Sequence, residues 1–455
     1  MTAHGNVLST IGNTPMVEVT RLDTGRCRLF LKLENQNPGG SIKDRIALSM
    51  IEAAERDGQL KPGGTLVEAT AGNTGLGLAL VAAQKGYRLV LVIPDKMAQE
   101  KVFHLRALGA EVRMTRSDVG KGHPDYYQDM AERLASETPG AFYVNQFANP
   151  ANPTAHELGT GPEIWQQMDH NLDAIVCGVG SGGTLTGLGR FFRRVQPNLR
   201  LILADPKGSV LAEMVRSGRM TEAGSWLVEG IGEDFIPPNC DLSFVAETHT
   251  IDDAESLGTA RELLRREGLL GGSSTGTLLA AALRYCRAQS EPRRVVTFVC
   301  DSGNKYLSKM FNDFWMRDQG LLDRDRAGDL RDLIARRHAD RAMITAAPGD
   351  TLLAAYGRMR LYDISQLPVM DGGKIVGILD ESDVLIAVYD YQDRFRDRVD
   401  SAMTKRLETV PATTSLNDLL PIFERGHVAV VMEGATVLGL ITRIDLLNHL
   451  RRRLR

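Results

Sequence analysis

The sequence predicts an α/β domain built on open sheets, followed by a smaller module that contains an internal repeat. Short apolar strands alternate with helical stretches from about residue 28 to 315. The composition changes near residue 317, and a 62-residue repeat follows. A chain of 455 residues is too long for one ordinary domain, so two or three are expected.

The strands of the first part are continuous apolar runs. Residues 88–94 (RLVLVIP) have the character of a strand buried on both faces of a parallel sheet, and residues 173–178, 201–204 and 295–300 resemble them. Amphipathic segments such as 98–109 and 261–268 lie between the strands. This alternation predicts open α/β sheets with helices on both faces.

The second part begins after a stretch dominated by arginine and aspartate, residues 316–341, which we interpret as a connecting helix or linker. Each copy of the repeat holds a strand pair followed by a helix, and neither copy is expected to bury its own core. We therefore expect a first domain over 1–316, a linker over 317–340 and a module over 341–455 with copies at 341–398 and 399–455. The matching positions are Val369 and Val431, Gly377 and Gly439, and Asp383 and Asp445.

Charge and cysteine content exclude several classes of protein. The net charge is −3 with acids and bases interspersed, so neither nucleic acid nor a membrane surface is expected as a partner. The five cysteines are scattered and include no Cys-x-x-Cys pair, so no disulfide framework and no metal site are predicted. No apolar run has signal-peptide or membrane-span length, and a cytoplasmic location is expected.

The first chemical motif is residues 39–45 (GGSIKDR). Ser41 is a candidate N-cap, and Asp44 stands three residues on, where it would complete a capping box. Lys43 then falls in the first turn of a helix, where the helix dipole disfavours a cation. A lysine with a lowered pKa is what imine formation requires.

The second motif, residues 68–75 (EATAGNTG), lies between a strand at 65–67 and a helix expected at 76–85. Its backbone N–H groups could form an anion cradle, and the Asn73 amide could bond a phenolate-like oxygen. Taken alone, the segment is equally well explained as a glycine-containing turn.

The third motif, residues 177–184 (CGVGSGGT), follows a buried strand and precedes a helix expected to begin near 185. Three glycines (Gly180, Gly182, Gly183) allow a close approach to a phosphate, and two hydroxyls (Ser181, Thr184) can bond it. The spacing and the mid-chain position differ from a dinucleotide fingerprint, so a monophosphate is predicted.

The fourth motif, residues 271–277 (GGSSTGT), precedes a helix expected at 278–287, and in isolation it is equally well explained as an N-capped helix start. Together the four motifs supply an amine, a phosphate cup, an amide for a ring oxygen and a hydroxyl for a ring nitrogen. Pyridoxal phosphate requires these groups.

With these motifs in this order, residues 7 to about 315 resemble the cystathionine β-synthase and cysteine synthase family of fold-type-II pyridoxal-phosphate enzymes. The resemblance implies a tryptophan-synthase-β-like domain of two open twisted sheets. The repeat resembles the paired CBS repeats of a Bateman module, which bind adenosyl compounds. The matching segments are residues 11–15 (IGNTP), 40–45, 72–75, 180–184 and 272–273.

Site residues follow from the resemblance. It implies that Lys43 is the Schiff-base lysine and removes the substrate α-proton, that Asn73 bonds the ring oxygen, and that Ser273, or its neighbour Ser274, faces the pyridine nitrogen. The implied phosphate site comprises Gly180, Ser181, Gly182, Gly183 and Thr184. The implied substrate-carboxylate site comprises Thr70, Gly72, Asn73, Thr74 and Gln146.

The implied reaction is a β-replacement that forms cystathionine from serine and homocysteine, with hydrogen sulfide released when cysteine replaces serine. Two departures from the family favour an alternative, an O-acetylserine-dependent cysteine synthase or cystathionine synthase. Ala71 stands where the family usually shows serine, and Glu233 stands where animal enzymes carry tyrosine. A nucleotide-sensing protein with the first domain as scaffold is a rival from another class. Haem is not expected, because the catalytic pattern starts almost at Met1.

In the second repeat, residues 439–445 fit a ribose-binding pattern, with Thr442 and Asp445 as hydrogen-bonding groups. The first repeat retains Asp383 but has Asp380 where the hydroxyl belongs, so a ligand there should be weakly bound or uncharged. A dimerisation module is an equally good interpretation of the repeats. A homodimer or larger homo-oligomer is expected.

Overall fold

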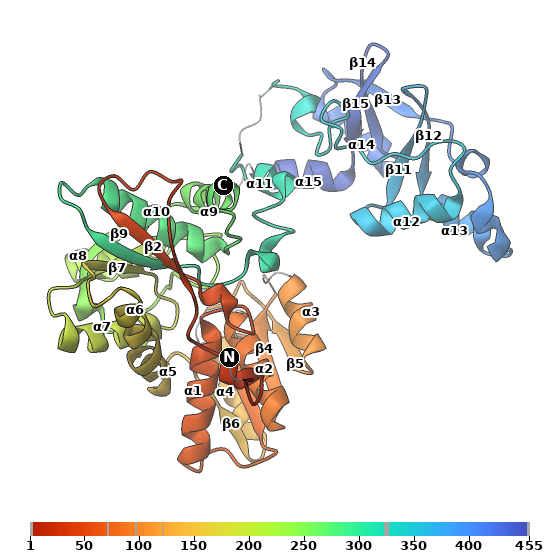
Figure 1. Cartoon of the computed structure of the whole chain (residues 1–455). Helices are drawn as coiled ribbons and strands as arrows, with labels where there is room; N and C mark the ends of the chain where they lie inside the picture. The colour runs from red at the N-terminus through yellow and green to blue at the C-terminus, as the bar shows by residue number, and fades with distance from the viewer. Residues whose placement is uncertain are drawn as a thin grey trace. The chain divides into compact units, whose positions relative to one another are not determined.

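The computed structural model consists of two compact units, Met1–Phe311 and Asn312–Arg455 (Figure 1). It describes residues 3–70, 72–95, 97, 99–120, 122–322 and 327–452.

The first unit contains two open sheets, as predicted. In the larger sheet the strand order is β1-β2-β10-β7-β8-β9, with β1 antiparallel to β2 and every other neighbour parallel. In the smaller sheet the order is β5-β4-β3-β6, and all neighbours are parallel. The strands are β1 (Met16–Glu18), β2 (Arg28–Lys32), β3 (Thr65–Ala69), β4 (Arg88–Pro94), β5 (Glu111–Thr115), β6 (Ala141–Tyr143), β7 (Ala174–Cys177), β8 (Arg200–Pro206), β9 (Val245–Ile251) and β10 (Arg294–Phe298).

Helices connect these strands and cover the sheets (Figure 1). They are α1 (Lys43–Arg56), α2 (Asn73–Lys85), α3 (Gln99–Ala107), α4 (Tyr127–Glu137), α5 (Ala151–Ala155), α6 (Gly161–Gln167), α7 (Gly183–Val195), α8 (Leu211–Ser217), α9 (Asp253–Glu267) and α10 (Ser273–Arg287). Short 3₁₀ turns lie at η1 (Val7–Thr10), η2 (Glu34–Gln36), η4 (Leu242–Phe244) and η5 (Gly303–Tyr306), and η3 (His156–Thr160) is a π-helical turn.

The core of the smaller sheet explains the apolar run at its centre. In β4 every residue after Arg88 is buried. Two apolar clusters include residues of this strand: one contains Leu91 and Ile93 with side chains of α1 and α2, and the other contains Val90 and Val92 with side chains of α4. Successive side chains of a strand point to opposite faces, so a strand covered on both sides must be apolar throughout.

Three helices begin earlier than the sequence predicted. α2 begins at Asn73, α7 at Gly183 and α10 at Ser273, so the glycine- and hydroxyl-rich motifs form the first helical turns. The motif residues therefore lie at helix N-termini, where N–H groups have no intrahelical partner.

Lys43 lies in the first turn of α1, as predicted, but the predicted capping box is wrong. The N-cap residue is Ile42, and no side chain caps the helix. Ser41 Oγ accepts a hydrogen bond from the Lys43 N–H (3.2 Å), while Asp44 Oδ2 accepts one from the Gly39 N–H (2.5 Å). The glycine turn before the helix folds back toward Asp44, which removes that carboxylate from the position that a capping box needs.

The second unit has two small sheets, β11-β12 and β13-β14-β15. Its strands are β11 (Gln366–Asp371), β12 (Lys374–Asp380), β13 (Glu408–Pro411), β14 (Ala429–Glu433) and β15 (Thr436–Ile441). Its helices are α11 (Asp313–Asp318), α12 (Leu352–Tyr362), α13 (Glu381–Val388), α14 (Leu416–Glu424) and α15 (Arg443–Arg452), with 3₁₀ turns η6 (Leu330–Asp332), η7 (Gln392–Arg396) and η8 (Val399–Ser401).

The internal repeat is confirmed at the level of strand register. Val369 pairs with Gly377 in the first copy, and Val431 pairs with Gly439 in the second. In both copies the register shifts directly after the valine. Each strand pair leads into a helix, α13 or α15, as the sequence predicted.

Each copy has an apolar cluster, and neither cluster is made by one copy alone. The cluster of the first copy includes Leu352, Leu367 and Leu379, together with the fully buried Val399 from the start of the predicted second copy. The cluster of the second copy is completed by side chains from outside it, Leu330, Leu333 and Ile334. Ile334 packs so tightly that a Cβ atom on Gly439 would lie 2.3 Å from its Cγ2.

These buried side chains fall within the span that we expected to be a linker, residues 317–340. We therefore propose that the second module begins before Leu330 and that only the preceding residues connect it to the first domain. A linker supplies no core residues, whereas residues 330–334 contribute three buried ones.

Candidate active site

Lys43 stands at the start of α1, next to the segment that follows β10. The Ile42 N–H donates to the Cys300 carbonyl (2.9 Å), and Ser41 forms an isolated β-bridge with Asp301. Burial lowers the pKa of the Lys43 ammonium, and the nearby acids only partly oppose this effect. The sequence predicted a lowered pKa from the helix dipole, and in the structure burial of Lys43 lowers it.

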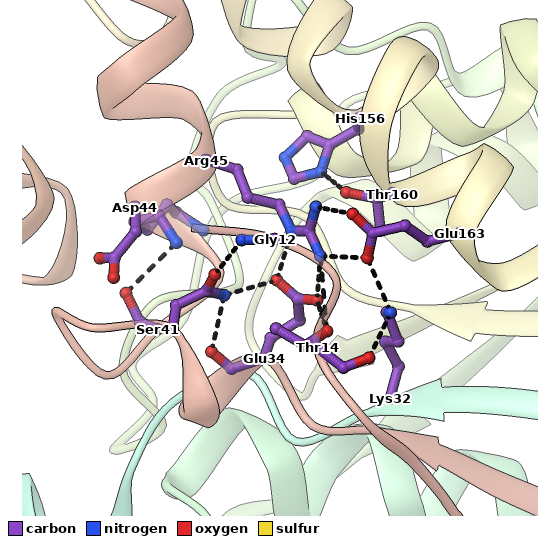
Figure 2. Close-up of polar contacts among 12 residues, drawn as sticks. Gly12, Thr14, Lys32, Glu34, Ser41, Asp44, Arg45, His156, Thr160 and Glu163 are labelled. Carbon is purple, nitrogen blue, oxygen red and sulfur yellow. Dashed lines mark hydrogen bonds and ion pairs between the residues drawn. The ribbon is translucent and has the colours of Figure 1, made fainter. Parts of the chain in front are cut away.

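A buried ion-pair network holds α1 in place (Figure 2). Arg45 lies between two carboxylates, with its Nε 2.7 Å from Glu34 Oε2 and its Nη1 2.7 Å from Glu163 Oε1. Lys32 Nζ lies 2.8 Å from Glu163 Oε2, and Thr14 Oγ1 donates to Glu34 Oε1 (2.6 Å). The IGNTP segment therefore anchors the lysine-bearing helix through Thr14.

The predicted substrate-carboxylate residues are connected to one another. Thr70 Oγ1 accepts hydrogen bonds from the N–H groups of Gly72 (3.1 Å) and Gly75 (3.3 Å). Thr74 Oγ1 donates to Gln146 Oε1 (2.6 Å), and the Gln146 amide donates to the Ala69 carbonyl (3.2 Å). The turn before α2 is thereby fixed beside Asn73, although its role toward a substrate stays a prediction.

The third motif forms an uncapped helix N-terminus. Gly182 is the N-cap of α7 in a left-handed conformation (φ 85°), and no side chain caps it. The loop also packs closely against the protein: a Cβ atom on Gly180 would lie 2.6 Å from the Gly230 carbonyl oxygen, and one on Gly183 would lie 1.8 Å from Asn152 Oδ1. Such an N-terminus can receive a phosphate.

The two hydroxyls of this loop contact Asn152 and His156, which were not predicted from the sequence. Asn152 Nδ2 donates to Ser181 Oγ (2.9 Å), and Thr184 Oγ1 lies 3.2 Å from His156 Nε2. The other ring nitrogen, His156 Nδ1, lies 2.9 Å from Thr160 Oγ1. Burial lowers the pKa of His156 well below its usual range, so the ring is neutral. One ring nitrogen therefore donates and the other accepts.

The fourth motif is not an ordinary capped helix start, which its sequence left open. The N-cap of α10 is Gly272, and no side chain caps it. Ser273 Oγ instead accepts a hydrogen bond from the Glu229 N–H (2.9 Å). Ser273 and Ser274 are both buried in the first turn, so both stay candidates for the pyridine nitrogen.

A polar cluster after β10 was also missed. The Asn73 amide donates to Asp301 Oδ2 (2.7 Å), which also accepts from the Tyr306 hydroxyl (2.7 Å). Lys101 Nζ lies 2.6 Å from Glu229 Oε2 and 3.2 Å from the same hydroxyl. The available signal was position, because polar residues directly after a buried parallel strand lie at the sheet edge where α/β sites form.

Of the two departures from the family pattern, Ala71 lies outside the described residues. Glu233 is held by its backbone, which exchanges hydrogen bonds with the Ser209 hydroxyl. Its Oε1 lies 4.0 Å from the position of a Cβ atom on Gly180, and its charge acts on the Lys43 ammonium. The carboxylate therefore lies near the loop that contains Gly180 and within electrostatic range of Lys43.

The second unit has a cavity of about 560 Å³ that includes the predicted ribose-binding pair. Asp445 Oδ2 accepts hydrogen bonds from Thr442 Oγ1 (2.6 Å) and from the Thr442 N–H (2.8 Å). The Asp445 N–H in turn donates to Thr442 Oγ1 (3.4 Å), and in the first repeat Asp380 and Asp383 form the corresponding reciprocal capping box. Charged or titratable groups on the cavity wall are Arg336, Asp363, His427, Arg443 and Asp445.

Within the described ranges, no group of three or more histidine, cysteine or acidic side chains could hold a metal ion. No helix among these described residues has the length and apolar character of a membrane span. The five cysteines are free thiols.

Two family models match the chain. The model for pyridoxal-phosphate dependent enzymes matches residues 7–301, and the CBS domain model matches residues 331–390 and 399–452. The geometry fits this cofactor, because a lysine with a lowered pKa, an uncapped α7 N-terminus and the Asn73 amide belong to the same unit. The first unit is therefore a pyridoxal-phosphate enzyme.

Comparison with individual proteins narrows the class. Cystathionine β-synthase from Dictyostelium discoideum is 37% identical over 98% of this chain and 92% of its own length. Cystathionine β-synthase from Oryctolagus cuniculus is also 37% identical, and the one from Saccharomyces cerevisiae is 33% identical over 98% of this chain and 97% of its own length. The chain belongs to the cystathionine β-synthase family.

Solved structures resemble the catalytic part. A hydrogen sulfide-producing enzyme from Fusobacterium nucleatum has a TM-score of 0.63 at 35% identity, covering 67% of this chain and all of its own. An O-ureido-L-serine synthase has a TM-score of 0.64 at 34% identity, covering 70% of this chain and all of its own. These two likenesses support the fold-type-II assignment.

Proposed function

We propose that the protein joins the thiol of homocysteine to the β-carbon of serine and forms cystathionine, with pyridoxal phosphate held by Lys43. The observation that carries the proposal is the placement of this lysine. Its ammonium is destabilised by burial, and it lies at the start of α1 beside Asp301, which bonds the Asn73 amide. Similarity to cystathionine β-synthases over 98% of the chain supports the choice of reaction.

When bound, pyridoxal phosphate supplies an electron sink for negative charge at the substrate α-carbon. Lys43 would attach it, because an amine that loses its proton readily is a nucleophile near neutral pH. The N–H groups at the start of α7, with Ser181 and Thr184, would bind the phosphate. Ser273, or Ser274, would face the pyridine nitrogen.

The turn from Thr70 to Thr74 would bind the substrate carboxylate through N–H groups and hydroxyls at the uncapped N-terminus of α2. Gln146 orients Thr74 through the bond between their side chains. Lys43 Nζ, once released, would hold the proton taken from the α-carbon. A serine at the pyridine nitrogen cannot keep that nitrogen protonated as a carboxylate would, which favours loss of the β-substituent over transamination.

The attachment is tested by replacing Lys43 with alanine. The purified wild-type protein should show the visible absorption band of bound pyridoxal phosphate, and Lys43→Ala should lack it. Lys85→Ala, at the far end of α2, is the matched control and should keep the band. Borohydride reduction and peptide mapping should place the label on Lys43, and a label on another lysine would refute the assignment.

The second candidate function is use of O-acetylserine instead of serine, in a cysteine or cystathionine synthase. The position of the Glu233 carboxylate near Gly180 and Lys43 favours it, since an acid there changes the charge that a leaving group meets. Steady-state turnover with serine plus homocysteine should exceed that with acetylserine plus sulfide or homocysteine. The reverse order would establish the alternative. Sulfide release from cysteine plus homocysteine is the expected side activity.

In the second unit we propose an adenosyl ligand, such as S-adenosylmethionine, in the cavity that contains Thr442 and Asp445. CBS domains commonly bind adenosyl ligands, and a cavity of about 560 Å³ lies in the range of small-molecule sites. The alternative is a module used only for dimerisation.

We also propose a homodimer or larger homo-oligomer that functions in the cytoplasm. Large apolar side chains are exposed on and around the helices of the first repeat, including Leu361 (75%), Ile386 (78%) and Tyr389 (76%). Apolar patches of this kind mark interaction surfaces. Light scattering should give at least twice the monomer mass, and a monomer at micromolar concentration would exclude the proposed assembly.

A further inference from the structure

A second buried lysine, Lys305, lies beside the proposed cofactor site. It belongs to η5, just after β10, and only 7% of it is exposed. Its Nζ donates to the carbonyl oxygens of Gly39 (3.2 Å) and Gly40 (3.1 Å) and to Asn73 Oδ1 (3.0 Å). An ammonium has three donors, so these three bonds use all of them.

These contacts decide which way the Asn73 amide points. An ammonium only donates, so it requires the amide oxygen on its side. On the other side, the amide nitrogen donates to Asp301 Oδ2 (2.7 Å). A flipped amide would place its NH₂ against the ammonium and its oxygen against the carboxylate. The Asn73 amide nitrogen carries a second N–H, and this orientation lets it donate to a ligand.

The same ammonium connects two motifs that are distant in sequence. Gly39 and Gly40 immediately precede the turn into Lys43, and Asn73 begins α2. Gly40 has a left-handed backbone (φ 75°), and a Cβ atom there would lie 3.5 Å from Lys305 Nζ. The lysine-bearing turn and the amide are therefore fixed relative to each other through one side chain.

We propose that Lys305 is a positioning residue that presents the Asn73 N–H to the ring oxygen of pyridoxal phosphate and adds positive charge near that oxygen. This inference rests on the proposed function, in which Asn73 bonds the ring oxygen. A positive charge and a fixed donor both stabilise the ionised oxygen. The ionised form absorbs in the visible and the neutral form in the near ultraviolet, so their ratio reports on the effect without turnover.

The test uses the full-length holoenzyme and three variants: Lys305→Arg keeps charge and donors, Lys305→Gln keeps a donor only, and Lys305→Met keeps neither. The ratio of visible to near-ultraviolet absorbance should follow wild type ≈ Arg > Gln > Met. Loss of one nearby charge should shift the midpoint of this ratio by about one pH unit, a change of about tenfold at a given pH. Lys85→Met is the control and should match the wild type.

The comparison between Gln and Arg decides the test even if Lys305→Met does not fold. Equal ratios and equal pH midpoints in wild type, Arg and Gln would overturn the inference while the Lys43-dependent band leaves the proposed function intact. If the wild type shows no such band, or Lys43→Ala retains it, the proposed function itself fails. A change only in thermal stability, with an unchanged spectrum, would show that Lys305 has a purely structural role and would also overturn the inference.

Discussion

The side-chain oxygen of Asn152 occupies the space that a methyl group on Gly183 would need. The distance from Asn152 Oδ1 to that Cβ position would be only 1.8 Å. Asn152 is fully buried and is fixed by donating to Ser181 Oγ and to the Gln146 carbonyl. A neighbouring side chain therefore requires glycine at position 183, independently of the role in phosphate binding that we propose for it.

Gly183→Ala should lower stability by about 1–3 kcal/mol, as overpacking does, and weaken pyridoxal phosphate binding. The double variant Gly183→Ala with Asn152→Gly removes the obstacle and should recover part of the loss, with a coupling of about 1 kcal/mol in denaturant unfolding. Gly258→Ala, inside α9 where nothing lies within 4 Å, is the control and should not lower stability, because alanine favours a helix over glycine. Additive effects of the two substitutions would contradict the steric explanation.

Glu163→Gln should destabilise the catalytic unit at neutral pH by about 3 kcal/mol, because it leaves Arg45 and Lys32 with an uncompensated buried charge. Burial alone would raise the pKa of Glu163, but hydrogen bonds and charge from Arg45 and Lys32 outweigh it and lower the pKa to about 2. Stability from this group is therefore present above the unfolded pKa of about 4.5 and is lost as pH falls toward 2.

The measurement is thermal unfolding of Glu163→Gln and wild type between pH 3 and 7 at equal cofactor loading. The two curves should converge as the pH falls. Glu213→Gln removes an exposed pair with Arg216 and should cost less than about 0.5 kcal/mol. A gap between Glu163→Gln and wild type that is constant over this range would contradict the assignment.

Glu68 should behave in the opposite way. Burial raises its pKa to about 8, and the Gln146 N–H that bonds its Oε2 (3.2 Å) only partly offsets this. The folded state therefore holds a proton that the unfolded state releases above about pH 4.5. The stability from this difference is present below pH 4.5 and is lost as pH rises through 8.

Glu68→Gln removes the titrating group, so its stability relative to wild type should rise by about 1.4 kcal/mol for each pH unit between about 4.5 and 8. Urea unfolding at pH 5, 7 and 9 measures it. Glu111→Gln, at a half-buried glutamate whose pKa is lowered by hydrogen bonds from Arg88 and Arg113, should show no such gain. Parallel pH profiles for Glu68→Gln and wild type would refute the raised pKa.

Asp445→Asn should reduce binding of S-adenosylmethionine by about tenfold or more, because it removes a charged acceptor from the cavity wall. The corresponding residue of the first repeat provides a matched control: Asp383→Asn breaks the capping box with Asp380 and should leave this affinity unchanged. Calorimetric titration measures both. Equal losses of affinity in the two variants, or no binding of S-adenosylmethionine by the wild type, would favour a module used only for dimerisation.

Strand positions were predictable because burial on both faces demands an unbroken apolar run, and residues 88–94 match β4 completely. Helix starts were less predictable. Glycine, serine and asparagine ordinarily precede helices, so we placed the start of α10 at 278, whereas it begins at Ser273. Here these residues are inside the first turn, with their side chains bonded to other parts of the unit.

The four motifs were identifiable because each is a pattern of several residues. Lys305, Asn152 and His156 belong to no pattern of that kind, and their roles depend on contacts with residues 28 to 266 positions away. Only the position of Lys305 after a buried strand could have drawn attention to it. The capping box failed for a related reason, since Asp44 prefers the backbone of Gly39.

The second unit also contains core residues from the segment that follows the first unit. Leu330, Leu333 and Ile334 precede the first repeat in the sequence, but they are buried in the core of the second repeat. The segment that follows the first unit is therefore held in the core of the second repeat. A protein truncated after residue 398 would lose the second repeat and expose these three apolar side chains to solvent. A change in its activity could then come from a misfolded connecting segment and would not by itself show the loss of a ligand.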